Sequence, residues 1–301
     1  MSRAYLIIQK VSFDHITHIA KFIHGELVSN FNEGADLIIC DEIDDIVHDE
    51  GAIIFVIGEG FKAHQRRPGC LYVYMNFSIV SVLGNPLNLS KVGWSAIRRK
   101  RRMLCEKKAY FDVVLDYFAP QTPRLMQLLN MPVFGFNAAV DPNRMTPTIP
   151  FQDRPFDVCF VGSLTPRRQK ILNALKACGL QLSPHNGVVY EDVAAQSRCC
   201  INIHAHRSNH LETPRIIGAI AAGTPIITEP CYGLDTVFPD DIVSVARLGN
   251  LVEVTQALCN DIGGGQNLII RGQDWYKNTY MPSCRASWKQ ICTHLSQEMT
   301  T

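Results

Sequence analysis

The sequence lacks several features that would assign it to a specialised class of protein. No apolar run approaches the roughly 20 residues that a membrane-spanning helix needs. None of the 11 cysteines forms a C-x-x-C pair, which argues against a zinc ribbon or a thioredoxin-like site, and the odd count favours reduced thiols. No internal repeat or low-complexity tract is visible. We therefore expect a folded cytoplasmic protein.

Net charge is also nearly absent. The chain has 29 lysines and arginines against 28 aspartates and glutamates, which leaves a formal charge of +1. Nothing global then favours a nucleic-acid partner, and any attraction to an anion must be local. Apolar residues make up 47% of the 301 residues and charged residues 19%, as in folded soluble proteins. This length favours two domains of ordinary size.

Short apolar runs alternate with helical patterns along the chain. Runs rich in Ile and Val without polar alternation predict strands of a parallel sheet covered on both faces. The fold class is therefore α/β, with two Rossmann-like, doubly wound domains facing across a cleft. The first half contains AYLIIQ, ADLIIC, AIIFVIG, LYVYMNF, FDVVLDY and MPVFGF, and the second half contains FDVCFVG, CCINIHAH and TPIITEP.

The domain boundary is expected where periodicity stops and four prolines lie between Pro142 and Pro155. We place the first domain at residues 1–140, a linker at 141–155 and the second domain at 156–280. The segment from Gln273 to Met299 is predicted to be helical with a break at Pro282. The terminal helix, residues 281–301, could bridge the two domains.

The stretch DVCFVGSLTPRRQKILNAL reads as a strand, a turn and a helix over roughly 166–178. Its arginines stand where the helix dipole disfavours positive charge, which makes sense if an anion binds there. Gly162 allows close backbone approach, Ser163 offers a hydroxyl, and Arg167 and Arg168 can chelate phosphate oxygens. An ordinary turn with two solvated arginines is the alternative.

The stretch NIHAHRSNHLETPR raises the question of a metal site. His204 and His206 would share one face of a strand and His210 follows in the loop, but these residues lack a carboxylate ligand at a defined spacing. We therefore expect no metal, and His204 is taken as a polar residue that reaches the ligand site.

A third motif, LETPRIIGAIAAGTPIITEP, begins with acidic and basic residues at a predicted helix start. Glu212 can accept hydrogen bonds from two ribose hydroxyls, and Thr213 and Arg215 lie beside it. The alternative role of Glu212 is favourable charge at a helix N-terminus. Ligands of open α/β sheets bind beyond the carboxyl ends of the strands, where these three motifs are predicted to meet.

Over roughly residues 133–235, the motifs DVCFVGSLTPRR, INIH and LETPRIIGAIAAGTPIITE resemble the nucleotide-sugar half of GT-B glycosyltransferases, especially small bacterial group-1-like enzymes. The resemblance implies a transferase that moves a sugar from a nucleotide-diphosphate donor to an unknown acceptor such as a glycan, lipid-linked carrier or protein, and it implies no cofactor. It also implies that Arg168 and Arg215 contact the diphosphate and Glu212 a hydroxyl.

The resemblance departs from the family pattern at one position. Gly218 stands where many retaining members carry a second glutamate, so inverting or retaining stereochemistry is not implied. Two rival functions use the same architecture: a nucleotide-sugar epimerase and a non-catalytic nucleotide-sugar-binding protein.

The first domain is then expected to hold the acceptor. The candidate bases for an inverting reaction are Glu59 and His64, in the loop GEGFKAHQRRPG, and Asp14 after the first strand. Each of these residues could instead be an ordinary surface residue.

The run RRKRRMLCEKK, from Arg98 to Lys108, is a basic helical segment without interleaved aromatic residues. A solvated helix face is one reading, and weak contact of Arg98–Arg102 with anionic lipid on the inner face of the membrane is another. Nucleic-acid binding is disfavoured because the rest of the chain is not basic.

Overall fold

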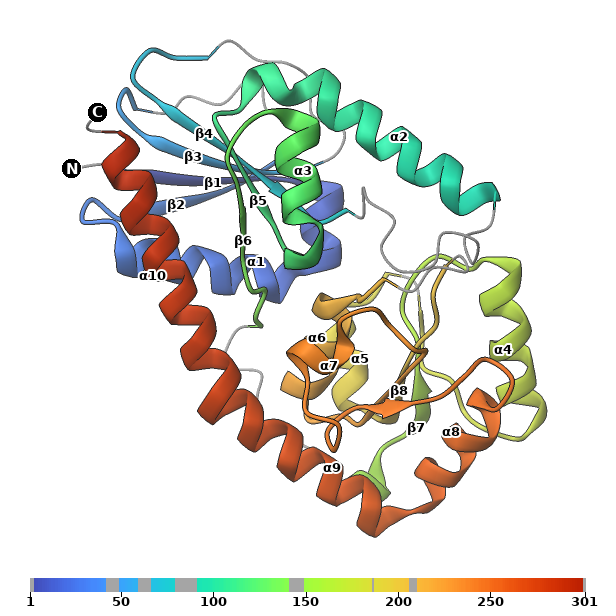
Figure 1. Cartoon of the computed structure of the whole chain (residues 1–301). Coiled ribbons are helices and arrows are strands. Elements are labelled where there is room, and N and C mark those ends of the chain that lie inside the picture. Colours follow the sequence, from blue (N-terminus) through green and yellow to red (C-terminus); the bar gives the residue numbers. More distant parts are fainter. Residues whose placement is uncertain are drawn as a thin grey trace. The chain divides into compact units, whose positions relative to one another are not determined.

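The computed structural model describes residues 3–41, 49–58, 66–78, 91–140, 149–185, 187–205 and 210–299. The described chain forms two compact units (Figure 1). The first comprises the residues up to Ser78, Trp94–Ala139 and the segment from Pro282 onward. The second comprises Val140–Met281 together with the described residues 91–93.

The first unit is built on a sheet of six strands in the order β2-β1-β3-β4-β5-β6, with all neighbouring strands parallel. Each strand lies within one of the six apolar runs of the first half, so these strand predictions are confirmed. The strands are β1 Ala4–Gln9, β2 Ala35–Cys40, β3 Ile53–Ile57, β4 Leu71–Asn76, β5 Val113–Asp116 and β6 Val133–Gly135.

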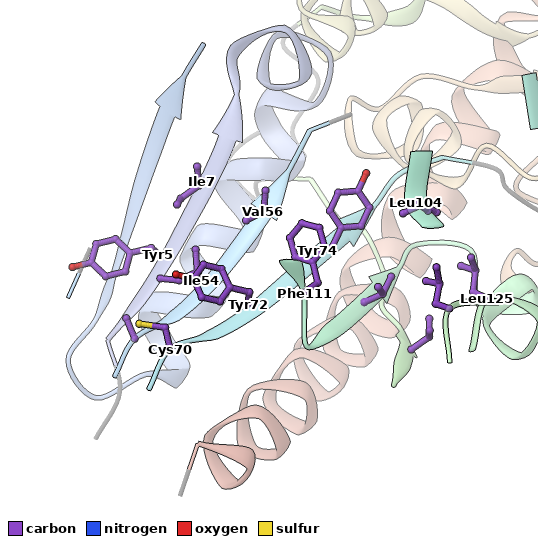
Figure 2. Packing of buried hydrophobic residues seen from close by; sticks show 14 residues of the cluster. Tyr5, Ile7, Ile54, Val56, Cys70, Tyr72, Tyr74, Leu104, Phe111 and Leu125 are labelled. Atoms are coloured by element: carbon purple, nitrogen blue, oxygen red, sulfur yellow. The ribbon is translucent and has the colours of Figure 1, made fainter. Parts of the chain in front are cut away.

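Helices cover both faces of this sheet, which explains why its strands are apolar throughout. On one face, Tyr72 and Tyr74 pack with Leu104 and Leu125, which come from helices α2 and α3 (Figure 2). On the other face, Trp288 of helix α10 lies with its ring centroid 6.5 Å from that of Phe55. The helices and 3-10 turns of this unit are α1 Lys10–Asn30, α2 Lys91–Lys107, η2 Lys108–Tyr110, η3 Ala119–Gln121, α3 Thr122–Leu129 and α10 Met281–Glu298.

A fully buried carboxylate lies at the carboxyl end of β5. Asp116 accepts hydrogen bonds from Asn76 Nδ2 (2.6 Å), Gln121 Nε2 (2.9 and 3.0 Å) and the backbone N–H of Phe118 (2.7 Å). Burial raises the pKa of Asp116 to about 6, although each of these hydrogen bonds acts to lower it. Asn76 and Gln121 also donate to the carbonyl of Ser78, so the carboxylate fixes the turn after β4.

The titration of Asp116 gives a testable pH dependence. Because its pKa is higher in the folded than in the unfolded chain, its contribution to the free energy of unfolding is full below the unfolded pKa of roughly 4 and is lost as pH rises through about 6. Carboxyl ¹³C chemical shifts of the native protein should show one aspartate with a midpoint near 6 that is missing in Asp116→Asn. A midpoint below 4 for Asp116 would contradict this environment.

The second unit contains a four-stranded parallel sheet in the order β10-β9-β8-β7. The strands β7 and β9 fall within the runs FDVCFVG and TPIITEP, and β8 overlaps the run CCINIHAH but begins two residues before it, so the predicted second α/β fold is also confirmed. The strands are β7 Phe156–Cys159, β8 Ser197–Asn202, β9 Ile226–Thr228 and β10 Ser244–Val245. The helices are η5 Phe151–Asp153, α4 Pro166–Ala177, α5 Tyr190–Ala195, α6 Thr213–Ala221, α7 Leu234–Val237, α8 Leu251–Asn260 and α9 Ile262–Trp275.

A buried arginine connects the segment that follows helix α6 to the start of β8, at the end of the sheet where this strand begins. Arg154 donates to the carbonyls of Ser197 (2.8 Å) and Gly223 (2.9 Å) and to Thr224 Oγ1 (3.2 Å). It is only 4% exposed, and burial lowers its pKa. These bonds set the position of α6, the helix that carries Arg215.

The C-terminal segment is helical as predicted, but Pro282 does not break it. A π-helical turn over Tyr276–Tyr280 (η6) follows α9, and Pro282 lies in the first turn of α10. A proline lacks the N–H that an α-helix interior needs, and a widened turn before it accommodates that loss. The bridging role of the terminal helix stays a prediction, as does the cleft between the domains. Among the described helices, none is both long and apolar enough to span a membrane.

Candidate functional site

The candidate site lies where the carboxyl ends of β7, β8 and β9 meet in the second unit. After β7, the chain turns through Gly162 and Ser163, and Thr165 caps helix α4 by accepting a hydrogen bond from the backbone N–H of Arg168. Pro166 occupies the first turn of α4, where its missing N–H costs nothing. The predicted strand, turn and helix are therefore present.

Gly162 is the residue of this turn that the arginine side chains of the site approach. Its φ of +142° lies in a region that other residues rarely adopt. A Cβ at this position would stand 3.3 Å from Arg168 Nη1 and 3.3 Å from Arg215 Nη2. Two guanidinium groups from different helices therefore converge on one backbone position.

Arg168 is held rigidly in this position. Its Nε donates to the carbonyl of Ile203 (2.8 Å), its Nη1 donates to the carbonyl of Ser163 (3.0 Å), and its guanidinium lies over the ring of Phe160. Burial lowers the pKa of Arg168 to about 10, with a further contribution from the positive charge of Arg215. The side chain still carries its charge at pH 7.

Arg215 enters from the first turn of α6. Its Nη1 lies 2.5 Å from Asn202 Oδ1 and 2.5 Å from Glu212 Oε2. Glu212 Oε1 is 3.9 Å from Arg168 Nη2, so one carboxylate lies beside both arginines. The structure thus brings Gly162, Arg168, Glu212 and Arg215 together, as their places in the sequence predicted.

Arg167 makes a different set of contacts. It forms a two-pronged ion pair with Glu229, in which Nη1 lies 2.6 Å from Oε2, and it also donates to the carbonyl of His204 (3.0 Å). Glu229 accepts the backbone N–H of His204 as well (2.8 Å). Burial raises the pKa of Glu229, but the hydrogen bonds of Arg167 together with the contributions of His204 more than offset this effect and hold the pKa below its usual value.

Sequence reasoning did not single out Glu229. The residue directly follows β9 and is buried beside the predicted site. An acidic residue at the carboxyl end of a buried parallel strand is the signal that could have identified it.

His204 is buried, with its Nε2 3.6 Å from Cys231 Sγ. Burial lowers its pKa, against the opposing charges of Glu212 and Glu229, so the ring is neutral at pH 7. Thr213 is buried as the first residue of α6, and Ser163 is exposed in the turn. Within the described ranges, no cluster of three His, Cys, Asp or Glu side chains could hold a metal ion, and His206 lies outside those ranges.

The three candidate bases belong to the first part of the chain. Asp14 lies on α1 and is exposed. Glu59 and His64 lie outside the described residues, so their roles stay predictions.

The sequence matches no protein-family model and no curated protein. Solved structures are similar in fold. Sucrose-phosphate synthase from Thermosynechococcus elongatus matches with a TM-score of 0.60 and 11% identity, covering 99% of this chain and 98% of that one. HepE from Anabaena in complex with UDP-glucose matches with a TM-score of 0.62 and 10% identity, covering 99% and 100%. TarM matches with a TM-score of 0.53 and 10% identity over 82% of this chain, which spans only 56% of the TarM chain.

These matches extend over nearly the whole chain for two of the three structures. Together with the two parallel sheets and their helices, they show that the chain has the fold of GT-B glycosyltransferases, with two Rossmann-like domains. The expected fold class is confirmed.

Proposed function

We propose that this chain is a glycosyltransferase that moves a sugar from a nucleotide-diphosphate donor, which binds at the carboxyl edge of the second sheet. The observation that carries this proposal is the convergence of Arg168 and Arg215 on Gly162: each guanidinium lies 3.3 Å from the position that a Cβ would occupy if Gly162 had one. Two fixed cations beside a helix start match the geometry of a diphosphate.

Local charge supports an anionic ligand. Arg167 is neutralised by Glu229, which leaves Arg168 and Arg215 against the single carboxylate of Glu212. The group of five residues therefore has an excess of one positive charge, in surroundings where burial strengthens electrostatic interactions.

The same arrangement suits the chemistry of glycosyl transfer. The reaction passes through an oxocarbenium-like state while negative charge builds on the departing diphosphate. Cations that are already fixed by hydrogen bonds to the protein stabilise that charge without having to reorganise. Arg168, held by two backbone carbonyls, has this property.

The structure of HepE, which contains UDP-glucose, favours uridine diphosphate as the first ligand to test. A thermal-shift screen with UDP, GDP, ADP, CDP and dTDP and their sugars should raise the melting temperature for at least one ligand, because a ligand that binds only the folded state stabilises it. No shift with any of them would contradict a donor site.

Incubation with the stabilising nucleotide sugar then separates the three functions. A transferase consumes the donor only when an acceptor is supplied. An epimerase converts the sugar without any acceptor, and a binding protein leaves the donor intact throughout. The proposal also includes a sugar acceptor bound by the first domain. Its general base in an inverting reaction would be Glu59, His64 or Asp14.

Helix α2 supports a further part of the proposal, contact with a membrane-borne acceptor. Arg98, Arg99, Arg101 and Arg102 are exposed on α2, whereas Ile97 and Leu104 are buried beneath them. Exposed basic residues near an anionic lipid surface contribute about 1 kcal/mol each, and salt weakens this attraction. The peripheral location on the inner face of the membrane rests on this helix.

We expect the chain to sediment with vesicles that contain phosphatidylserine at low ionic strength, and to dissociate as salt is raised. The fourfold variant Arg98→Gln, Arg99→Gln, Arg101→Gln and Arg102→Gln should lose this binding and keep its melting temperature. Sedimentation that is the same for both proteins would remove the membrane contact from the proposal.

A further inference from the structure

The two arginines of the proposed diphosphate site already share a carboxylate within the chain. Glu212 Oε2 lies 2.5 Å from Arg215 Nη1, and Glu212 Oε1 lies 3.9 Å from Arg168 Nη2. Glu212 therefore supplies the negative charge between two cations that both lie against Gly162.

The carboxylate of Glu212 reduces the repulsion between Arg168 and Arg215. Like charges that approach each other in a partly dry environment repel strongly, and the Arg168 side chain is only 3% exposed. The contacts to Glu212 offset that repulsion. The side chains of Glu212 and Arg215 are 25% and 20% exposed, which places their ion pair between a surface pair and a fully buried one.

We propose, on the basis of the donor site described above, that Glu212 is an internal counter-ion which the diphosphate displaces when it binds. A diphosphate carries more negative charge than one carboxylate, and its oxygens can bridge both guanidinium groups. The partial exposure of Glu212 gives its side chain a route to solvent. Once displaced, the carboxylate becomes available to accept hydrogen bonds from the ribose hydroxyls of the same ligand.

Displacement has a measurable consequence for affinity. When an internal contact must open before a ligand can bind, only the molecules in which that contact is open bind the ligand. The observed affinity is then the intrinsic affinity multiplied by the fraction of such molecules. Glu212 would thus lower the affinity for every anion at this site, whereas a residue that only accepts hydroxyl hydrogen bonds would not affect an anion without hydroxyls.

Inorganic pyrophosphate, which has no hydroxyl-bearing ribose, separates these two roles. Calorimetry should show that Glu212→Gln binds pyrophosphate roughly tenfold more tightly than the parent. The expected gain reflects the ion pair that no longer has to be broken, whose intermediate exposure gives it a strength between that of a weak surface pair and that of a strong buried pair. The gain for UDP should be smaller, since the loss of the hydroxyl contact opposes it.

The matched control is Glu253→Gln, which makes the same change of charge at an exposed position on α8. Its pyrophosphate affinity should stay within about twofold of the parent, because the charge of a solvent-exposed carboxylate is screened by water and salt. An equal gain in both variants would mean that net charge, and not the contact of Glu212, governs binding, and would overturn the inference.

The remaining outcomes distinguish this inference from the proposed function. If the parent binds pyrophosphate, Arg215→Ala loses that binding, and Glu212→Gln binds no more tightly than the parent, the counter-ion role is wrong while the donor site stands. If no variant binds pyrophosphate or UDP, both are wrong. Should Glu212→Gln fail to fold, a crystal structure of the parent with pyrophosphate decides: the contact of Glu212 with Arg215 is expected to be broken, and its retention contradicts displacement.

Discussion

Replacing Arg168 with alanine is expected to weaken the binding of UDP by about ten- to a hundredfold, the usual effect of losing a charge-assisted contact of roughly 1.5–3 kcal/mol. The same variant should also lower the free energy of unfolding, because the carbonyl of Ile203 loses its donor in a buried environment and the carbonyl of Ser163 loses a partly buried one. Calorimetry with UDP, performed well below the melting temperature of the variant, measures the first effect.

Two further variants separate binding from folding. Arg168→Lys should recover only part of the affinity, since an ammonium group cannot reproduce the two-pronged geometry of a guanidinium. Arg215→Ala should weaken UDP binding as well, and it should also lower the free energy of unfolding, because the buried Asn202 Oδ1 loses its donor while the partly exposed Glu212 loses its ion-pair partner. A folded Arg168→Ala variant that binds UDP as tightly as the parent would remove the main support for the donor site.

The second large effect is expected at the ion pair of Arg167 and Glu229. The Glu229 side chain is 7% exposed, so Arg167→Ala leaves a buried carboxylate without its main partner. We expect the free energy of unfolding to fall by about 2–4 kcal/mol, somewhat less than for a fully buried pair because Arg167 is partly exposed. Urea denaturation provides the measurement.

The double variant Arg167→Ala with Glu229→Gln should recover much of that loss, since the unpaired charge is then removed. Arg271→Ala is the surface control: its partner Asp241 is 63% exposed, and such pairs contribute about 0–1 kcal/mol. If Arg167→Ala is no more destabilising than Arg271→Ala, Glu229 does not depend on Arg167 in the way its contacts indicate.

The positions of the strands along the chain could be anticipated because parallel sheets leave a strong pattern in sequence. The runs AYLIIQ and LYVYMNF are buried on both sides by helices, so they contain almost no polar residues, and their bounds match β1 and β4 within one residue. The turn at Gly162 and the helix from Pro166 could be predicted for a similar reason, since glycine and proline restrict the backbone locally.

The partners of the charged residues could not be predicted. Arg167 and Arg168 are adjacent in sequence, but successive residues on a helix point about 100° apart, so one meets Glu229 and the other Gly162. Which arginine faces which group depends on how α4 packs on the sheet. The buried Asp116 was missed likewise, because its donors Asn76 and Gln121 come from separate segments.

A crystal structure of the chain with UDP would show directly whether the diphosphate binds at the carboxyl edge of the second sheet. We expect the diphosphate to lie over the turn at Gly162, with its oxygens within hydrogen-bonding distance of the guanidinium groups of both Arg168 and Arg215. A structure in which UDP binds elsewhere, with Arg168 and Arg215 contacting no phosphate oxygen, would contradict this expectation.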